Sequence, residues 1–228
     1  MRNLIWKEFR QNSRVLLAVA IVAFAPYAMV VSFKLTCESN PAPAGRLIDA
    51  IAKASSFSLL LSCLLAAFLG GNAMAGERAD RSAEFAAGLP IPRRPAIASK
   101  LAVSLGACLA LFLVNYAVLA LLLPLAEPNL TAASNFIRSM ALVFLVMVGT
   151  FGIAWFFSSL LRSPAIAAAA AIGTATMLVM IVRQAYGWEV PENTARLSLG
   201  DSIALSILAL GVVLLVAGTG IALRRKEP

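Results

Sequence analysis

The charged residues that could carry chemistry are concentrated in one segment, residues 76–100, which reads GERADRSAEFAAGLPIPRRPAIASK. Its acids Glu77, Asp80 and Glu84 are spaced by three and four residues, with arginines between them. Acids gathered at one membrane face could hold a divalent cation for a lipid-modifying enzyme. Interleaved with arginines, they are more typical of paired charges on a helix. The spacing predicts a short helix from Glu77 to Ala87.

Other classes of chemistry are poorly supported by the residue types. Histidine is absent, which argues against histidine-dependent proteases and histidine metal sites. The sequence also lacks the glycine-rich loop G-x-x-x-x-G-K-[ST] that cradles ATP phosphates. We therefore expect no cofactor on this chain, and any ATP-derived energy must come from a partner.

The segment lies between long apolar runs that must position it. The chain has 228 residues, of which 61% are hydrophobic, and its mean hydropathy is +0.87. A hydrocarbon core of about 30 Å needs roughly 20 residues of helix. The sequence predicts one all-α membrane domain over residues 1–228, with transmembrane helices at 15–33, 55–75, 101–124, 139–161, 164–182 and 203–223.

These six spans contain no Asp, Glu, Lys, Arg or His. Carriers driven by protons or ions normally keep such a residue within the membrane. A self-sufficient secondary transporter is therefore disfavoured. The most polar group in mid-span is Asn115, which could either bond to another helix or line a pathway.

Basic residues predict the orientation. With a cytoplasmic N-terminus, thirteen of the 19 Lys and Arg residues fall on the cytoplasmic side and six on the other. Both termini and residues 76–100 are then cytoplasmic. The net charge of +8 follows from this orientation, so nucleic-acid binding is not needed to explain it.

Residues 1–14 resemble an amphipathic helix in pattern. Phe9 would lie on its apolar side, Trp6 at headgroup depth, and Arg10 would face anionic lipid. We expect an interfacial helix there, although a simple positive flank that fixes topology would leave the same pattern.

The end of the 76–100 segment is rich in helix-breaking residues. Gly88 should stop the short helix. Pro90, Pro92 and Pro95 then predict an extended elbow whose tip carries Arg93 and Arg94. An ordinary basic loop is one interpretation, and a docking element is the other. The shaped helix, glycine stop and prolines favour docking.

This segment resembles the loop between helices 2 and 3 of ABC-2 type transporter permeases, which have a type V exporter-like fold. The likeness is to the pattern E-R-x-x-G-T-x-E-x-L-L-x-x-P-I-S-R followed by a Lys, and Lys100 supplies the last position. In that family the segment is a coupling helix that seats in a groove of an ATPase subunit. The resemblance and the residue pattern make the expected coupling residues Glu77, Arg78, Arg81, Ser82, Glu84, Phe85, Pro90, Arg93 and Arg94.

The resemblance implies a permease subunit without its own ATPase site, most simply an exporter in a bacterial cytoplasmic (inner) membrane. Its expected partners are two ABC ATPase subunits, which bind ATP and Mg, and a second permease chain forming a homo- or heterodimer. A membrane scaffold or accessory subunit, or a membrane-embedded lipid-modifying enzyme, remains the alternative.

Overall fold

The computed structural model describes residues 2–37, 44–79, 92–126, 130–186 and 199–224. This part of the chain is helical, and no strand occurs among the described residues. The helices are α1 (Arg2–Cys37), α2 (Ala44–Ala79), α4 (Arg93–Ala126), α5 (Leu130–Leu160), α6 (Pro164–Tyr186) and α7 (Leu199–Arg224). Each is long and apolar enough to cross a membrane, which confirms the predicted class and the six spans.

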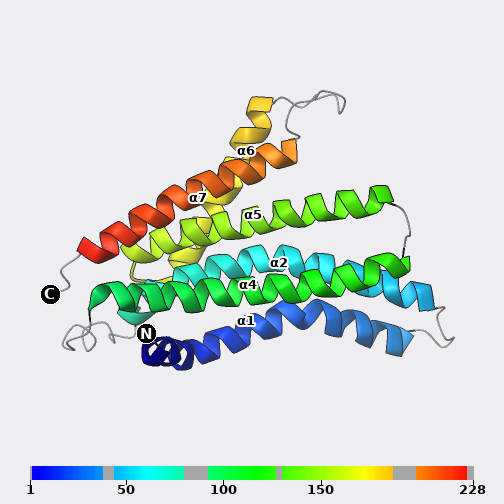
Figure 1. Ribbon diagram of the computed structural model, residues 1–228, viewed down its shortest axis with the longest axis horizontal. Helices are drawn as coiled ribbons and strands as arrows, with labels where there is room; N and C mark the ends of the chain where they lie inside the picture. The colour runs from blue at the N-terminus through cyan, green and yellow to red at the C-terminus, as the bar shows by residue number, and fades with distance from the viewer. Residues whose placement is uncertain (1, 38–43, 80–91, 127–129, 187–198, 225–228) are drawn as a thin grey trace.

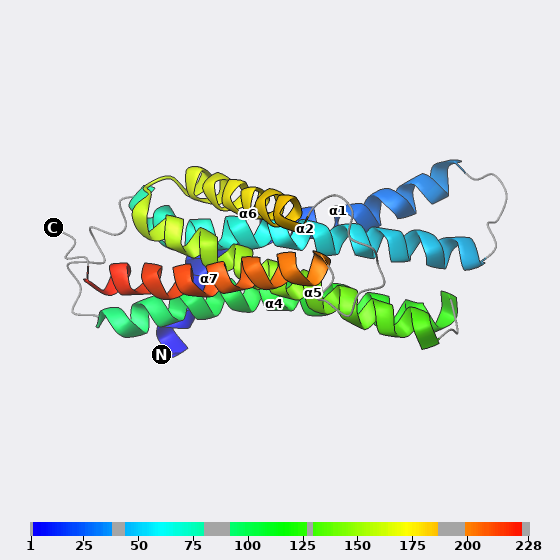
Figure 2. The same cartoon turned by 90° about the horizontal axis from the view of Figure 1, so that it is seen from above.

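The bundle is organised around α2 and α5. Helix α2 contacts α1, α4, α5 and α6, and α5 contacts α2, α4, α6 and α7. Figure 1 shows α1 on one side of the bundle and α6 and α7 on the other, with the start of α1 and the end of α7 at the same end. We call this end the terminal end. Because successive helices alternate in direction, α2 and α5 finish there and α4 and α6 begin there (Figure 2).

Glycines allow the closest helix approaches. A Cβ atom on Gly149 of α5 would lie 2.5 Å from the carbonyl oxygen of Ile207 in α7. A Cβ atom on Gly152 would overlap the backbone of Gly211, also in α7. Gly218 lies in the same way against the Phe156 backbone. Small residues of this kind let helices pack backbone to backbone in a membrane, where burial of apolar surface gives little driving force.

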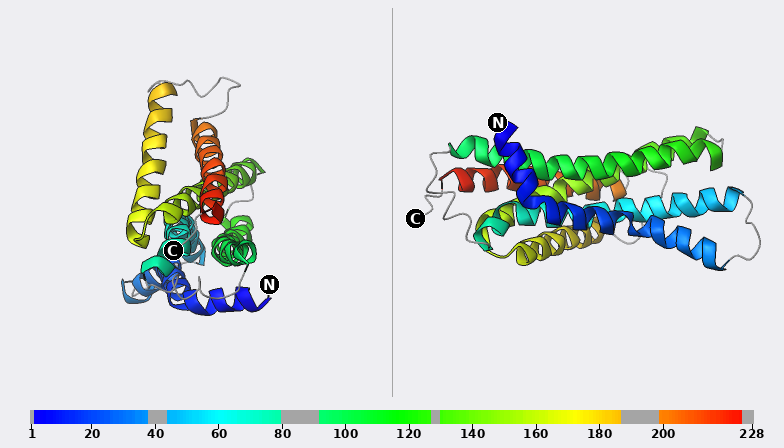
Figure 3. Two further views of the ribbon diagram at one scale, coloured as in Figure 1. Left: turned by 90° about the vertical axis from the view of Figure 1, so that its left-hand side faces the viewer. Right: turned by 90° about the horizontal axis from the view of Figure 1, so that it is seen from below.

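Two boundaries differ from the predictions. Residues 1–14 are continuous with the first span in α1, although the first turns of α1 run across the terminal end at a steep angle to the rest (Figure 3). Helix α4 begins at Arg93, so Arg93, Arg94 and Pro95 lie in its first turn and not in the predicted extended elbow. Pro95 fits the first turn of α4 because amides there need no intrahelical acceptor.

Candidate functional site

The candidate site is the terminal end of the bundle, where α2 ends and α4 begins. Four of the predicted coupling residues belong to the described part of the chain. Glu77 and Arg78 lie in the last turn of α2, and Arg93 and Arg94 form the exposed start of α4. The others lie outside the described residues, namely Arg81, Ser82, Glu84, Phe85 and Pro90.

Glu77 connects α2 to α4 and α1 through a shared lysine. Its carboxylate forms an ion pair with the Lys100 ammonium of α4. The Glu8 carboxylate of α1 lies 3.9 Å from the same nitrogen. The side chains of Lys100, Glu8 and Glu77 are only 10%, 5% and 18% exposed. Removing one member of such a buried group leaves an uncompensated charge, so the cluster holds the three helix ends together.

Arg78 connects α2 to α5. One guanidinium nitrogen, Nη1, donates to the backbone carbonyls of Ser158, at 3.2 Å, and Leu161, at 3.1 Å. The last carbonyls of a helix have no intrahelical donor and carry partial negative charge. Arg78 therefore caps the end of α5 with a cation supplied by α2.

Ser158 strengthens the same contact from the other side. Its buried hydroxyl accepts hydrogen bonds from the backbone amides of Met74 and Ala75, both at 2.9 Å. In a regular helix these amides donate to the carbonyls of residues 70 and 71. The hydroxyl therefore shares these two amides with the carbonyls of the α2 hydrogen-bond ladder. Helix α5 thus contacts the backbone of α2 as well as Arg78.

Two adjacent glycines fit α2 between its neighbours just before this contact. A Cβ atom on Gly70 would lie 2.8 Å from the Phe151 carbonyl oxygen of α5. A Cβ atom on Gly71 would lie 3.0 Å from the Ala168 amide nitrogen of α6. Helix α2 thus packs closely between α5 and α6 at Gly70 and Gly71, about two turns before it ends at Ala79.

The predicted interfacial residues lie on the first turns of α1. The side chains of Trp6 and Phe9 are 65% and 49% exposed, and their rings stack with centroids 6.1 Å apart. Arg10 is exposed as well. An exposed aromatic pair beside a cation is typical of headgroup depth, and their interfacial role stays a prediction.

Asn115 belongs to a polar contact between helices. Its side-chain oxygen accepts a hydrogen bond of 2.7 Å from the Tyr27 hydroxyl of α1, and its amide nitrogen donates to the Leu111 carbonyl at 2.9 Å. Ser55 of α2 donates to the Asn115 backbone carbonyl at 3.2 Å. Asn115 is fully buried. This geometry favours interhelical bonding over a role in lining a pathway.

Comparison with known families gives one assignment. The family model described as ABC-2 family transporter protein matches residues 2–210. The chain belongs to this family. It is therefore a membrane subunit of an ABC transporter, and membership implies association with an ABC ATPase. Neither the curated proteins nor the solved structures contain a match to the chain.

Sequence reasoning missed two residues that build the site of this ABC-2 transporter protein, Ser158 and Glu8. Ser158 stands in a run of apolar residues and resembles any small polar residue near a helix end. Glu8 lies within the N-terminal segment predicted to be amphipathic, and it was not singled out from the sequence. An acidic residue among Lys and Arg in a basic flank is the one signal that could have indicated a buried partner.

Proposed function

We propose that this ABC-2 permease couples ATP hydrolysis by two separately encoded ABC ATPase subunits to export of a substrate across a bacterial cytoplasmic membrane. Both termini and residues 76–100 face the cytoplasm, where the ATPases bind ATP and Mg. A second permease chain, identical or related, completes the pathway. Family membership supports the general role, and the anchoring of the helix ends supports the coupling route.

One observation carries the proposal: both helices that flank residues 80–91 are fixed to other helices at the terminal end. Arg78 fixes the end of α2 to α5. Lys100 fixes the start of α4 to Glu77, with Glu8 of α1 beside it. A loop that only joined two spans would not need these contacts. A displacement applied to this segment would therefore act on α1, α2, α4 and α5 together.

The proposed mechanism is mechanical. Closure of the ATPase dimer displaces the 76–100 segment and with it the last turn of α2. Ser158 and Arg78 carry the displacement to α5, and the close contact at Gly152 and Gly211 carries it on to α7. Transport then requires that the bundle can adopt two packings and that the ATPase contact shifts the equilibrium between them.

Co-purification tests the docking role. The double variant Arg81→Ala/Phe85→Ala should lose the nucleotide-binding chain that accompanies the wild-type protein from native membranes. The matched control is Ser139→Ala/Arg183→Ala, which changes residues of α5 and α6 at the opposite end, and it should retain that chain. Unchanged co-purification of the first variant would refute docking. Absence of any nucleotide-binding chain with the wild type would favour a scaffold.

A further inference from the structure

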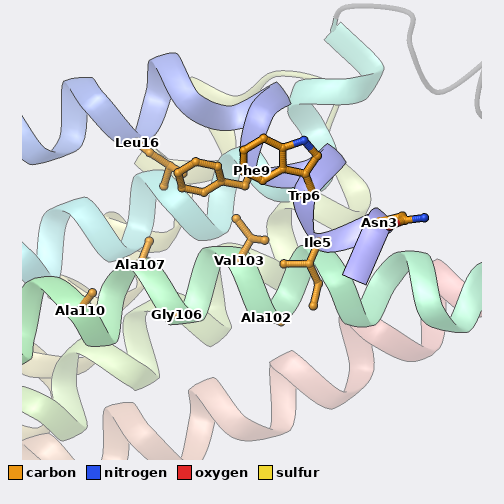
Figure 4. Close-up of a pocket in the computed structure, with 10 residues that line it drawn as sticks. All are labelled: Asn3, Ile5, Trp6, Phe9, Leu16, Ala102, Val103, Gly106, Ala107 and Ala110. Carbon is orange, nitrogen blue, oxygen red and sulfur yellow. The ribbon is translucent and has the colours of Figure 1, made fainter. Parts of the chain in front are cut away.

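A groove of about 1220 Å³ lies on the surface between the first turns of α1 and the start of α4. Ile5, Phe9 and Leu16 line it from α1, and Val103, Gly106 and Ala110 line it from α4. Figure 4 shows Phe9, Ile5 and Val103 around an open floor formed by the α4 backbone at Gly106. A Cβ atom on Gly106 would have no neighbour within 4 Å. The described chain leaves this space open.

The groove runs over only part of the membrane thickness. From Ala102 to Ala110 the floor of the groove extends eight residues along α4, or about 12 Å. Half of a hydrocarbon core is about 15 Å. Beyond Ala110, α4 presents large exposed side chains at Leu113 and Leu121, which are 58% and 73% exposed. The groove therefore matches the chain of a lipid in one leaflet, whereas a transmembrane helix of a partner would need a seat across both.

The charged residues beside the groove, on the first turns of α1, decide which lipid headgroup fits there. Lys7 and Arg10 are exposed on the first turns of α1, and Arg10 lies one turn from Trp6, which lines the groove. The acids of this end that the structure describes, Glu8 and Glu77, are turned toward Lys100 inside the bundle. The surface beside the groove is thus positive, which favours a negative headgroup.

We propose that this groove binds an anionic phospholipid of the leaflet at the terminal end. One acyl chain lies along the Gly106 floor between Phe9 and Val103, and the headgroup phosphate lies beside Arg10 and Lys7. Trp6, at the rim, reports on occupancy. The proposal requires membrane insertion and is independent of which ATPase or substrate the permease serves.

Quenching of tryptophan fluorescence by brominated lipids tests the site in the full-length protein, reconstituted in phosphatidylcholine nanodiscs. The difference between wild type and Trp6→Phe isolates the signal of Trp6 from the signals of Trp155 and Trp188. Brominated phosphatidylglycerol should quench this signal at a mole fraction roughly tenfold lower than brominated phosphatidylcholine. Equal quenching by the two lipids would overturn the proposal.

Filling the groove supplies the second measurement. Gly106→Leu should abolish the preference for phosphatidylglycerol. Gly220→Leu, in α7 near the same end and also without a neighbour within 4 Å of its Cβ position, should keep it. Arg10→Gln/Lys7→Gln, which changes exposed side chains, should reduce the tenfold preference to about onefold to threefold. A preference for phosphatidylglycerol that persists in both the Gly106 and the Arg10 variants would refute the site. The site would also be refuted if a second copy of the chain fills the groove. In that case Gly106→Leu would separate dimers, and the two brominated lipids would quench the wild-type protein equally.

Discussion

The contact between α5 and α7 predicts a strong effect from the smallest possible side chain at Gly152. A Cβ atom there would overlap the Gly211 oxygen and carbon, whereas ordinary contacts lie at 3.4–4 Å. Because the obstruction is backbone, no side chain can rotate away, and α7 must shift by about 1 Å. A gap of this size forfeits a quarter to a half of each dispersion contact along the interface. We expect Gly152→Ala to lower the free energy of unfolding by about 3 kcal/mol, the upper end of the cost of overpacking.

The assay is unfolding of the purified protein in mixed micelles by sodium dodecyl sulfate. Tryptophan fluorescence follows it, because Trp155 of α5 donates a hydrogen bond of 3.2 Å to Thr219 of α7. Gly106→Ala and Gly220→Ala are matched controls, since neither Cβ atom would have a neighbour within 4 Å. These two should be neutral or stabilising by up to about 1 kcal/mol, because alanine is the better helix former. A Gly152→Ala protein as stable as the controls would refute the close packing of α5 on α7.

Three other predictions follow from single contacts. Asn115→Ala should lower the free energy of unfolding by about 1 kcal/mol, since the Tyr27 hydroxyl loses its acceptor, and Tyr27→Phe in that background should cost little more in the same assay. Lys100→Met should lower the free energy of unfolding by about 3 kcal/mol, because it leaves buried carboxylates without their cation. The double variant Lys100→Met/Glu77→Met should recover part of that loss, and equal stability of the two variants would contradict the cluster. Arg78→Gln should keep ATPase association but reduce the stimulation of ATP hydrolysis by transport, because α2 loses its charged cap on α5. ATP hydrolysis is measured in proteoliposomes, and full stimulation would contradict the coupling route.

The number of spans and the fold class could be predicted from sequence because they depend on length and hydropathy alone. The six charge-free runs fall on six helices in the same order. Helix ends were less predictable. Pro95 suggested an extended elbow, but a proline costs a helix nothing in its first turn. The boundary predicted at residue 14 does not interrupt the helix, because the chain changes direction within one continuous helix, α1 (Figure 3).

The candidate site was predictable only where it is charged. Glu77 and Arg78 stood out as acid and base at the end of a span, and the structure gives each a partner on another helix. Lys100 was expected only as the last position of the family pattern, and its ion pair with Glu77 was not predicted from the sequence. Ser158 lies 80 positions beyond Arg78, and nothing in its neighbourhood distinguishes it from Ser159. Long-range pairing of this kind depends on the packing of α2 on α5, which the hydropathy pattern does not encode.

We propose that residues 76–100 engage an ATPase on the cytoplasmic face. The most direct test replaces Phe85 with a photo-crosslinking benzoylphenylalanine in the intact cell membrane, with the same group at Ser139 of α5 as the control for the opposite end. We predict a light-dependent adduct between position 85 and a nucleotide-binding chain, and none from position 139. An adduct from position 139 instead, or labelling of position 85 by lipid alone in the assembled complex, would contradict the account.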